Sequence, residues 1–359
     1  MPGFIFTDYL WLLFSYKRGR KNFRYLDKNK RVFPKIFQKF INIHINIPNV
    51  LKAESKTIKS IGSINDSTSI KVKKMYESYP FPRWKAVKSK IEYTNNDSFR
   101  SKLKNKELDN FLSMKDNKEI LIAGCGTGKE AIYMAQEFKN SNITAIDLSL
   151  GSLSYAKKKA KDIGVNNLNF FHCDILNVKS LNKNFDIINC SGVLHHMDCP
   201  EDGLKSLIGS LKNSGIMNIG LYSRIARERI SKGRDIIKSL NLENNREDIR
   251  KFRDLVKNEL HEFKQFLNIR DFFSYYEVQD LLFHPREVLF DLIEIEKLLK
   301  DNNLKFIEFD QKYNEVKKLY QNNFPEDVQL SSLENWNSFE INFPDTFLGM
   351  YQFYIRKIH

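Results

Sequence analysis

Cysteine is scarce in this sequence, and its placement argues against a disulfide framework. The 359 residues include only four cysteines: Cys125, Cys173, Cys190 and Cys199. None forms a C-x-x-C pair and no Cys/His cluster has the spacing of a zinc site, so we expect no metal centre. Reduced thiols of this kind are typical of a cytoplasmic protein, which is the location that we expect.

Long apolar runs are also lacking. Residues 1–14 are apolar and aromatic but include Asp8, and the segment is too short to span a bilayer. It has neither the basic start nor the cleavage site of a signal peptide. Two interpretations stay open for this segment and the basic residues 17–21 behind it: a peripheral membrane anchor, or a helix that docks on the protein itself.

Negative charge is in deficit. Lysine and arginine total 58 against 44 acidic residues, which gives a net charge of +14. Such an excess is typical of proteins that bind nucleic acid, anionic lipid or acidic substrates. The excess is spread along the chain, which is rich in Asn, Ile and Lys throughout, so a compositional bias of the genome is a slightly better explanation.

From residue 119 the chain alternates between short apolar runs, typical of buried strands, and segments with helical spacing. The pattern predicts strands at Glu119–Ala123, 143–147, 168–172, Phe185–Ser191 and 216–222, and helices at 129–138, Leu150–Ile163 and 201–211. This alternation specifies a parallel sheet with helices on both faces.

The alternation breaks after the fifth strand. Residues 223–288 are typical of long basic amphipathic helices, with apolar residues along one face: Ile249, Phe252, Val256, Leu260, Phe263 and Leu267. A helix near 290–300 and strands at 305–310 and Met350–Lys357 then resume the pattern. We therefore expect an N-terminal extension and linker (1–73), an α/β core (74–222), a helical substrate or lid insertion (223–288) and the completion of the core (289–359).

Two segments before the first predicted strand have irregular signatures. Residues 60–69 are rich in Ser, Asn and Thr, which predicts a linker or loop. Residues 75–84, Met-Tyr-Glu-Ser-Tyr-Pro-Phe-Pro-Arg-Trp, contain two prolines, which predict extended backbone.

The strongest local motif is Gly-Cys-Gly-Thr-Gly at residues 124–128, between the first strand and its helix. Glycines at 124 and 126 allow a sharp turn and a close ligand, at which the helix amides then point. A dinucleotide fold requires a further glycine in G-x-G-x-x-G, where this chain has Lys129. The spacing therefore disfavours a pyrophosphate cradle.

Acids follow the next two strands. Asp147 ends the second strand, where a carboxylate can accept both hydroxyls of a ribose, or can cap the next helix instead. Asp174 follows the third strand, where it can accept an adenine amino group with Cys173 and Ile175 beside the ring. The alternative for Asp174 is an ordinary loop residue.

The fourth strand runs into Asn-Cys-Ser-Gly-Val-Leu-His-His-Met at residues 189–197. The small residues Ser191 and Gly192 would leave room for the reactive end of a ligand. His195 and His196 could act as a general base, because imidazole titrates near neutral pH, or could serve only in packing and hydrogen bonding.

These four elements, in this order, resemble the class I methyltransferases that use S-adenosylmethionine (SAM), over about residues 115–222. The resemblance implies an α/β, Rossmann-like sheet, mostly parallel with an antiparallel last strand, plus a helical insertion after strand five and an N-terminal extension. It also implies SAM as the cofactor. The expected cofactor residues are Gly124, Cys125, Gly126, Gly128, Asp147, Leu148, Cys173, Asp174, Ile175, Ser191 and Tyr76.

Motifs on both sides of this region resemble a more specific group of methyltransferases. Residues 76–84, 220–227, 280–284 and 347–353 are similar to bacterial methyltransferases that are often fused to tetratricopeptide repeats. That match covers about residues 74–357. Residues 1–70 depart from it, because they show no helix-pair repeat.

The same flanks hold candidates for the acceptor side. Tyr76 and Tyr79 could fold over the cofactor, whose sulfonium an aromatic face stabilises, or could form a hydrophobic latch. Arginine forks could clamp an anionic acceptor, and other side chains could face it. These candidates are Arg83, Tyr222, Arg224, Arg227, His284 and Glu287.

We therefore expect a methyltransferase with a small or medium acceptor, which could be anionic. The sulfonium methyl is already activated, so the protein mainly positions the reactants and excludes water. The chain has no Asn/Asp-Pro-Pro-Tyr run after strand four and no Pro-Cys pair, so the usual signatures of base methylation in nucleic acids are missing. RNA nevertheless stays the runner-up acceptor because of the net charge. Two further functions stay open: a nicotinamide-dependent dehydrogenase, which Lys129 disfavours, and a silent SAM-binding module.

Overall fold

The computed structural model describes residues 38, 41–78, 80, 84, 105–114, 117–310, 314–347 and 349–358. The chain divides into two compact units, residues 1–53 and 54–359. Residues described near the end of the first form η2 (Asn42–Asn46) and begin α4 (Ile47–Ser55). The membrane anchor considered for residues 1–21 lies outside the described part. None of the described helices combines the length and the hydropathy that a membrane crossing requires.

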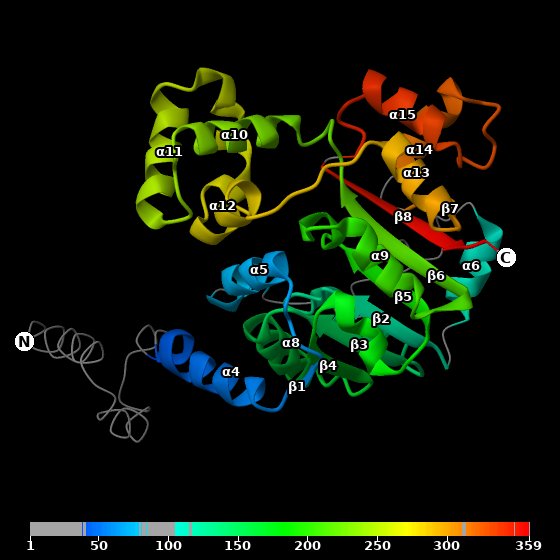
Figure 1. The fold of residues 1–359 in the computed structure, drawn as a ribbon, viewed down its shortest axis with the longest axis horizontal. Helices are drawn as coiled ribbons and strands as arrows, with labels where there is room; N and C mark the ends of the chain where they lie inside the picture. The colour runs from blue at the N-terminus through cyan, green and yellow to red at the C-terminus, as the bar shows by residue number, and fades with distance from the viewer. Residues whose placement is uncertain are drawn as a thin grey trace, which may run out of the picture. The chain divides into compact units, whose positions relative to one another are not determined.

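The second unit is built on one eight-stranded sheet with the order β1-β4-β3-β2-β5-β6-β8-β7 (Figure 1). Strand β8 lies between β6 and β7 and runs antiparallel to both, whereas the other pairs are parallel. The strands are β1 (Lys59–Ile61), β2 (Glu119–Ala123), β3 (Asn142–Asp147), β4 (Leu168–Cys173), β5 (Phe185–Ser191), β6 (Leu211–Tyr222), β7 (Leu304–Phe309) and β8 (Met350–Lys357). The expected Rossmann-like fold class is confirmed.

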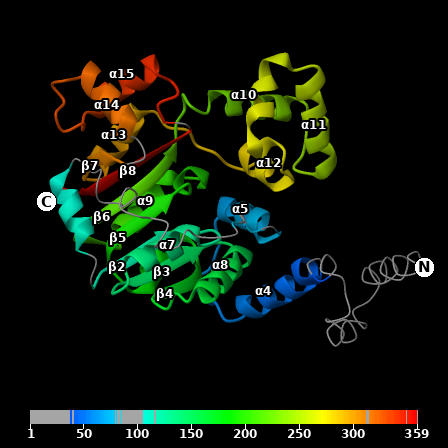
Figure 2. The same ribbon diagram turned by 180° about the vertical axis from the view of Figure 1, so that it is seen from behind.

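Helices cover both faces of the sheet because side chains alternate along buried strands. In β2, Ile120 and Ile122 join an apolar cluster with residues of α6, α7 and α8, whereas Leu121 joins another with residues of α9, α13, α14 and α15. Figure 2 shows the same sheet from behind. These helices are α6 (Lys106–Ser113), α7 (Lys129–Glu137), α8 (Leu150–Ile163), α9 (Pro200–Ile208), α13 (Leu292–Asp301), α14 (Asn314–Asn323) and α15 (Leu333–Asn342).

Helix α8 has the bounds that the sequence predicts, because both of its ends carry capping signals. The Ser149 side chain accepts a hydrogen bond from the Ser152 N–H at the start, and Gly164 ends the helix in the left-handed conformation at φ 80°. Ends without such signals differ more from the prediction: β6 begins earlier, at Leu211, and α9 ends earlier, at Ile208.

After β6 the chain enters a helical insertion with an apolar core of its own. The prediction of long helices is wrong, because α11 ends at Asn258 and 3-10 turns follow. All six predicted apolar residues still contact this core, since the turns keep their side chains on the same side. The elements are α10 (Glu228–Ser239), α11 (Arg246–Asn258), η5 (His261–Asn268), η6 (Arg270–Phe272) and α12 (Tyr275–Leu282).

The two ends of the insertion meet at the end of β6. The Phe290 N–H donates to the Tyr222 carbonyl at 3.0 Å, and the Arg224 N–H donates to the Phe290 carbonyl at 2.8 Å. Ser223 and Phe290 form an isolated parallel bridge. The chain therefore returns to the point of the sheet that it left.

Two upstream elements correct the sequence prediction. Residues 60–69, expected as a linker or loop, supply Ser60 and Ile61 to β1 and begin α5 (Ser67–Ser78). The Ser60 hydroxyl hydrogen-bonds the His172 ring at 3.0 Å, beside the pairing of β1 with β4. Residues 75–78 are helical and not extended, because the first proline, Pro80, comes only after the helix ends.

Candidate active site

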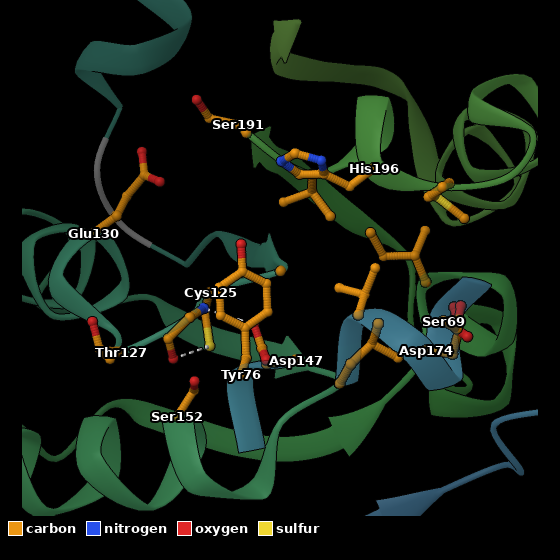
Figure 3. A pocket seen from close by; sticks show the side chains of 18 of the residues that line it. Ser69, Tyr76, Cys125, Thr127, Glu130, Asp147, Ser152, Asp174, Ser191 and His196 are labelled. Carbon is orange, nitrogen blue, oxygen red and sulfur yellow. Dashed lines mark hydrogen bonds between the residues drawn. The ribbon is translucent and has the colours of Figure 1, made fainter. Parts of the chain in front are cut away.

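A cavity of about 330 Å³ lies at the carboxyl ends of β2, β3, β4 and β5, the edge at which open α/β sheets bind ligands. Figure 3 shows Tyr76, Cys125 and Asp147 on one side of it, and His196 and Ser191 on the other. The lining comes from these strand ends, from α5, from the first turns of α7 and α8, from the segment after β5, from the end of β6 and from α12: Ser69, Val72, Tyr76, Gly124, Cys125, Gly126, Thr127, Lys129, Glu130, Asp147, Leu148, Ser152, Cys173, Asp174, Ile175, Ser191, Gly192, Val193, His196, Met197, Tyr222 and Asp280.

The backbone itself requires glycine at the two ends of the turn after β2. Gly124 has φ 71°, and a Cβ there would lie 2.4 Å from the Val193 side chain. Gly128 has φ 78°, and a Cβ there would lie 2.5 Å from that of Ala156. A side chain at either position would be strained and would clash. Room for a ligand, the reason inferred from the sequence, is therefore only part of the explanation.

Asp147, at the end of β3, accepts hydrogen bonds from the backbone N–H groups of Gly126 at 2.7 Å and Ser149 at 2.8 Å. It is not the cap of the next helix, because the Ser149 side chain fills that role for α8. Burial raises the pKa of the Asp147 carboxyl to about 6, against the two hydrogen bonds, which lower it. The group is therefore mostly ionised at neutral pH, with spare lone pairs for hydroxyl donors.

The carboxyl end of β4 brings Cys173, Asp174 and Ile175 to the cavity, beside Leu148 from the end of β3. Asp174 is buried, and its carboxylate accepts the Leu176 N–H at 3.0 Å as the cap of η3 (Ile175–Leu181). A carboxylate has about four acceptor positions, so capping leaves capacity for a ligand donor.

The two histidines of η4 (Leu194–His196) differ in position. His196 lines the cavity, and its Nδ1 donates to the Arg286 carbonyl at 2.8 Å, so Nε2 is left as an acceptor. Burial lowers the pKa of His196 to about 4, which keeps the ring neutral. His195 is outside the cavity lining, fully buried and stacked on Tyr222 at 3.7 Å between ring centroids. The structure therefore brings His196, and not His195, to the cavity.

Beside the cavity, the acceptor candidates of the insertion form a buried polar cluster. Arg227 donates to both carboxylate oxygens of Glu287, at 2.7 and 2.9 Å, and lies 3.7 Å from the ring centroid of Tyr222. His284 stacks on His196 at 3.7 Å between centroids. Only Tyr222 and His196 of this cluster line the cavity. Arg227, one of the arginines expected to clamp an anionic acceptor, therefore already binds the carboxylate of Glu287.

Of the other two arginine candidates, the structure describes only Arg224, and it does not line the cavity. Arg224 is half exposed, donates to Glu294 at 2.6 Å and is absent from the cavity lining. Arg83, like Tyr79, lies outside the described residues.

Sequence reasoning missed Asp280 of α12, which lines the cavity and accepts a hydrogen bond from the Tyr76 hydroxyl at 2.5 Å. This bond joins α5 to the insertion across 204 positions of sequence. Burial raises the pKa of Asp280 to about 6. The only available signal was its place in the 280–284 motif. The other lining residues that were missed are Ser69, Val72, Thr127, Lys129, Glu130, Ser152, Val193 and Met197.

Comparisons with known proteins agree with this geometry. Residues 120–215 match a family model described as a methyltransferase domain. An uncharacterized protein of Synechococcus sp. is 40% identical over 119 residues, which are 33% of this chain and 28% of that protein. A ubiquinone biosynthesis O-methyltransferase of Rickettsia canadensis is 32% identical over 112 residues, which are 31% of this chain and 46% of that enzyme.

A solved structure shares the fold. PKMT2 from Rickettsia typhi in complex with AdoHcy superposes with a TM-score of 0.54 at 15% identity, covering 68% of this chain and 50% of that one. The chain thus spans between about a quarter and a half of the length of these relatives. Together, the strand order and the family match show that the central sheet has the Rossmann-like fold of class I methyltransferases and that residues 120–215 resemble a methyltransferase domain.

Proposed function

We propose that this chain is a SAM-dependent methyltransferase with a small or medium acceptor. The observation that carries the proposal is the meeting of three ligand-binding elements at one cavity: the glycine turn, Asp147 and Asp174. They lie on the carboxyl ends of three adjacent strands, β2, β3 and β4. A dehydrogenase is disfavoured because Lys129 replaces the third glycine of a pyrophosphate cradle.

The residues at the cavity fit each part of SAM. Gly124, Cys125 and Gly126 would hold the amino-acid end, and Asp147 would accept the ribose hydroxyls. Gly128 is absent from the cavity lining and would act by shaping the turn, where it lies against Ala156. Leu148, Cys173, Asp174 and Ile175 would enclose the adenine, and Ser191 and Tyr76 would lie toward the sulfonium. SAM supplies a methyl group that is already activated, so the chain has to bind, orient and exclude water.

His196 is the better of the two histidine candidates because its free Nε2 belongs to the cavity wall. A ring with a pKa of about 4 is a weak base. The ring is therefore suited to accepting a hydrogen bond from the methyl acceptor and so orienting it. It is less suited to removing a proton from a weakly acidic group. His195 would act through packing under Tyr222.

Each part of the chain would have its own role in this function. Residues 74–222 and 289–359 would form the SAM-binding core, residues 223–288 the substrate or lid insertion, and residues 1–73 an N-terminal extension that adds β1 and part of α5 to the core. The kinship with methyltransferases fused to tetratricopeptide repeats, which rests on the flanking motifs, belongs to this proposal. So does a cytoplasmic location, which the four free cysteines support.

The acceptor class is decided by offering the protein labelled SAM together with a cell extract divided into small molecules, RNA and protein. Label in the small-molecule fraction supports the proposal. Label in RNA alone would establish the runner-up, an RNA methyltransferase that uses the basic surface. A protein that binds SAM and labels no fraction would be a silent SAM-binding module.

Replacing Asp147 by alanine tests the cofactor site. Loss of a carboxylate that accepts two ribose hydroxyls should weaken SAM binding at least tenfold, about 1.4 kcal/mol, by calorimetry. Asp162→Ala is the matched control, because this acid lies exposed on α8, where it pairs with Lys158. Unchanged affinity in the Asp147 variant would refute the ribose assignment.

A further inference from the structure

The wall of the cavity contributed by the insertion carries a carboxylate that the proposed cofactor site does not use. Asp280 projects from α12 into the lining, and among the described residues its hydrogen bond comes from the neutral hydroxyl of Tyr76. A buried carboxylate is costly unless a cation or several donors compensate it. One phenol supplies a single donor and no charge.

Two arginines of the insertion, Arg227 and Arg234, are committed elsewhere. The Arg227 guanidinium forms its paired hydrogen bonds with Glu287 and stacks on Tyr222. Arg234 donates to the His284 carbonyl at 2.7 Å and lies 3.4 Å from Glu287. Neither contacts Asp280 within hydrogen-bond distance. The pKa of Asp280 is raised only to about 6, mainly by burial, so the group is ionised at pH 7.5.

Aromatic rings share this part of the wall. Tyr76, Tyr222 and His196 all line the cavity together with Asp280. An aromatic face attracts a cation, and a carboxylate within reach adds a direct charge pair. An anionic acceptor would instead meet the like charge of Asp280, while Arg227 and Arg224 already face Glu287 and Glu294.

We propose that Asp280 binds the ammonium form of an amine, so that the acceptor of this methyltransferase is an amine and not an anion. An ammonium nitrogen has no lone pair, so methylation requires that it first give up one proton, and the Asp280 carboxylate that contacts it is the base that takes this proton. The proposal rests on the function proposed above. Tyr76 holds the carboxylate in place, and the rings of Tyr222 and His196 frame the cation. The sulfonium of SAM is a second cation of the same chemistry, and the experiment has to separate the two.

The test uses the full chain loaded with S-adenosylhomocysteine, which fills the cofactor site without a sulfonium. Benzylamine, benzyl alcohol and benzoate then serve as probes that share one ring and differ in charge. We expect benzylamine to bind about tenfold or more tightly than benzyl alcohol, and benzoate most weakly, by calorimetry or ligand-observed NMR.

Asp280→Asn should bring benzylamine and benzyl alcohol to within about twofold of each other, because it removes one charge pair and keeps an acceptor for Tyr76. Asp254→Asn is the matched control, an exposed acid of α11 in the same insertion, and should keep the preference. Retained binding of S-adenosylhomocysteine shows that each variant is folded.

Three results would overturn parts of the proposal in different ways. Equal binding of the probes, or a preference for benzoate, refutes the amine while leaving the methyltransferase proposal intact. An Asp280→Asn variant that loses affinity for SAM but not for S-adenosylhomocysteine, and keeps its amine preference, assigns Asp280 to the sulfonium. A wild-type protein that binds neither SAM nor S-adenosylhomocysteine refutes the proposed function itself.

Discussion

Asp280 destabilises the ligand-free protein at neutral pH, because folding moves its carboxyl out of water without a cation in hydrogen-bond contact, and the more distant charge of Arg227 only partly offsets this burial. The folded pKa of about 6 lies above the unfolded value near 4. The folded state therefore binds the proton more tightly, and the free energy of unfolding falls as pH rises between these two values.

The Asp280→Asn variant lacks this titration. Its stability relative to the wild type should rise by about 2 kcal/mol between pH 4.5 and pH 7.5, measured by urea unfolding at each pH. Asp254→Asn, a substitution of an exposed acid on α11, is the control variant. A flat difference between the Asp280 variant and the wild type would mean that Asp280 is not desolvated.

Among single residues, the acids at strand ends could be predicted and the acids of the insertion could not. Asp147 and Asp174 follow buried strands, so the strand pattern alone assigns them to one edge of the sheet. Asp280 reaches the cavity only because α12 packs opposite α5, and Arg227 is occupied only because Glu287 folds back beside it. Neither pairing leaves a trace in local spacing.

At the scale of elements, the insertion folds around a cluster separate from the two of the sheet. Phe266 is fully buried in that cluster and stacks on Phe272 and Phe263. Phe266→Ala should destabilise the insertion by about 3–5 kcal/mol. Hydrogen exchange should rise in peptides from 223–288 and stay low in β2 and β5.

Phe273→Ala is the control for this prediction, since its side chain is 56% exposed and belongs to no core cluster. It should change stability by less than about 0.5 kcal/mol. Exchange that rises equally in the strands and the insertion of the Phe266 variant would show that the two fold as one cooperative unit.

Elements with strong local signals matched their predictions, and weak ones did not. Helix α8 is bounded by the cap of Ser149 and by Gly164, both visible in the sequence. Strand β1 has three residues and exists only through its pairing with β4, so its Ser-rich neighbourhood indicated a loop. The apolar spacing through Leu260 and Phe263 fits one long helix as well as a helix followed by 3-10 turns, since both satisfy the same core.

At the scale of the whole molecule, the net charge of +14 raises the question of nucleic acid. A protein that neutralises 6–10 phosphates loses roughly 10³–10⁵ in affinity between 50 and 200 mM salt. With an amine acceptor we expect the KM for the acceptor to change by less than about tenfold over this range, because a single charge pair is screened only modestly. A steep rise of KM with salt would favour RNA.

The closure of the insertion at its base, where Phe290 bonds back to Tyr222 and Arg224, has an evolutionary consequence. The two ends of this segment leave and rejoin the sheet as hydrogen-bonded neighbours. Its length and sequence can therefore change with little effect on the sheet, as in a cassette. It can be lengthened, trimmed or exchanged between related chains without moving the register of β6. Under the function proposed above, an exchange of this segment would change the acceptor side of the cavity and would leave the ends of β2, β3 and β4 in place.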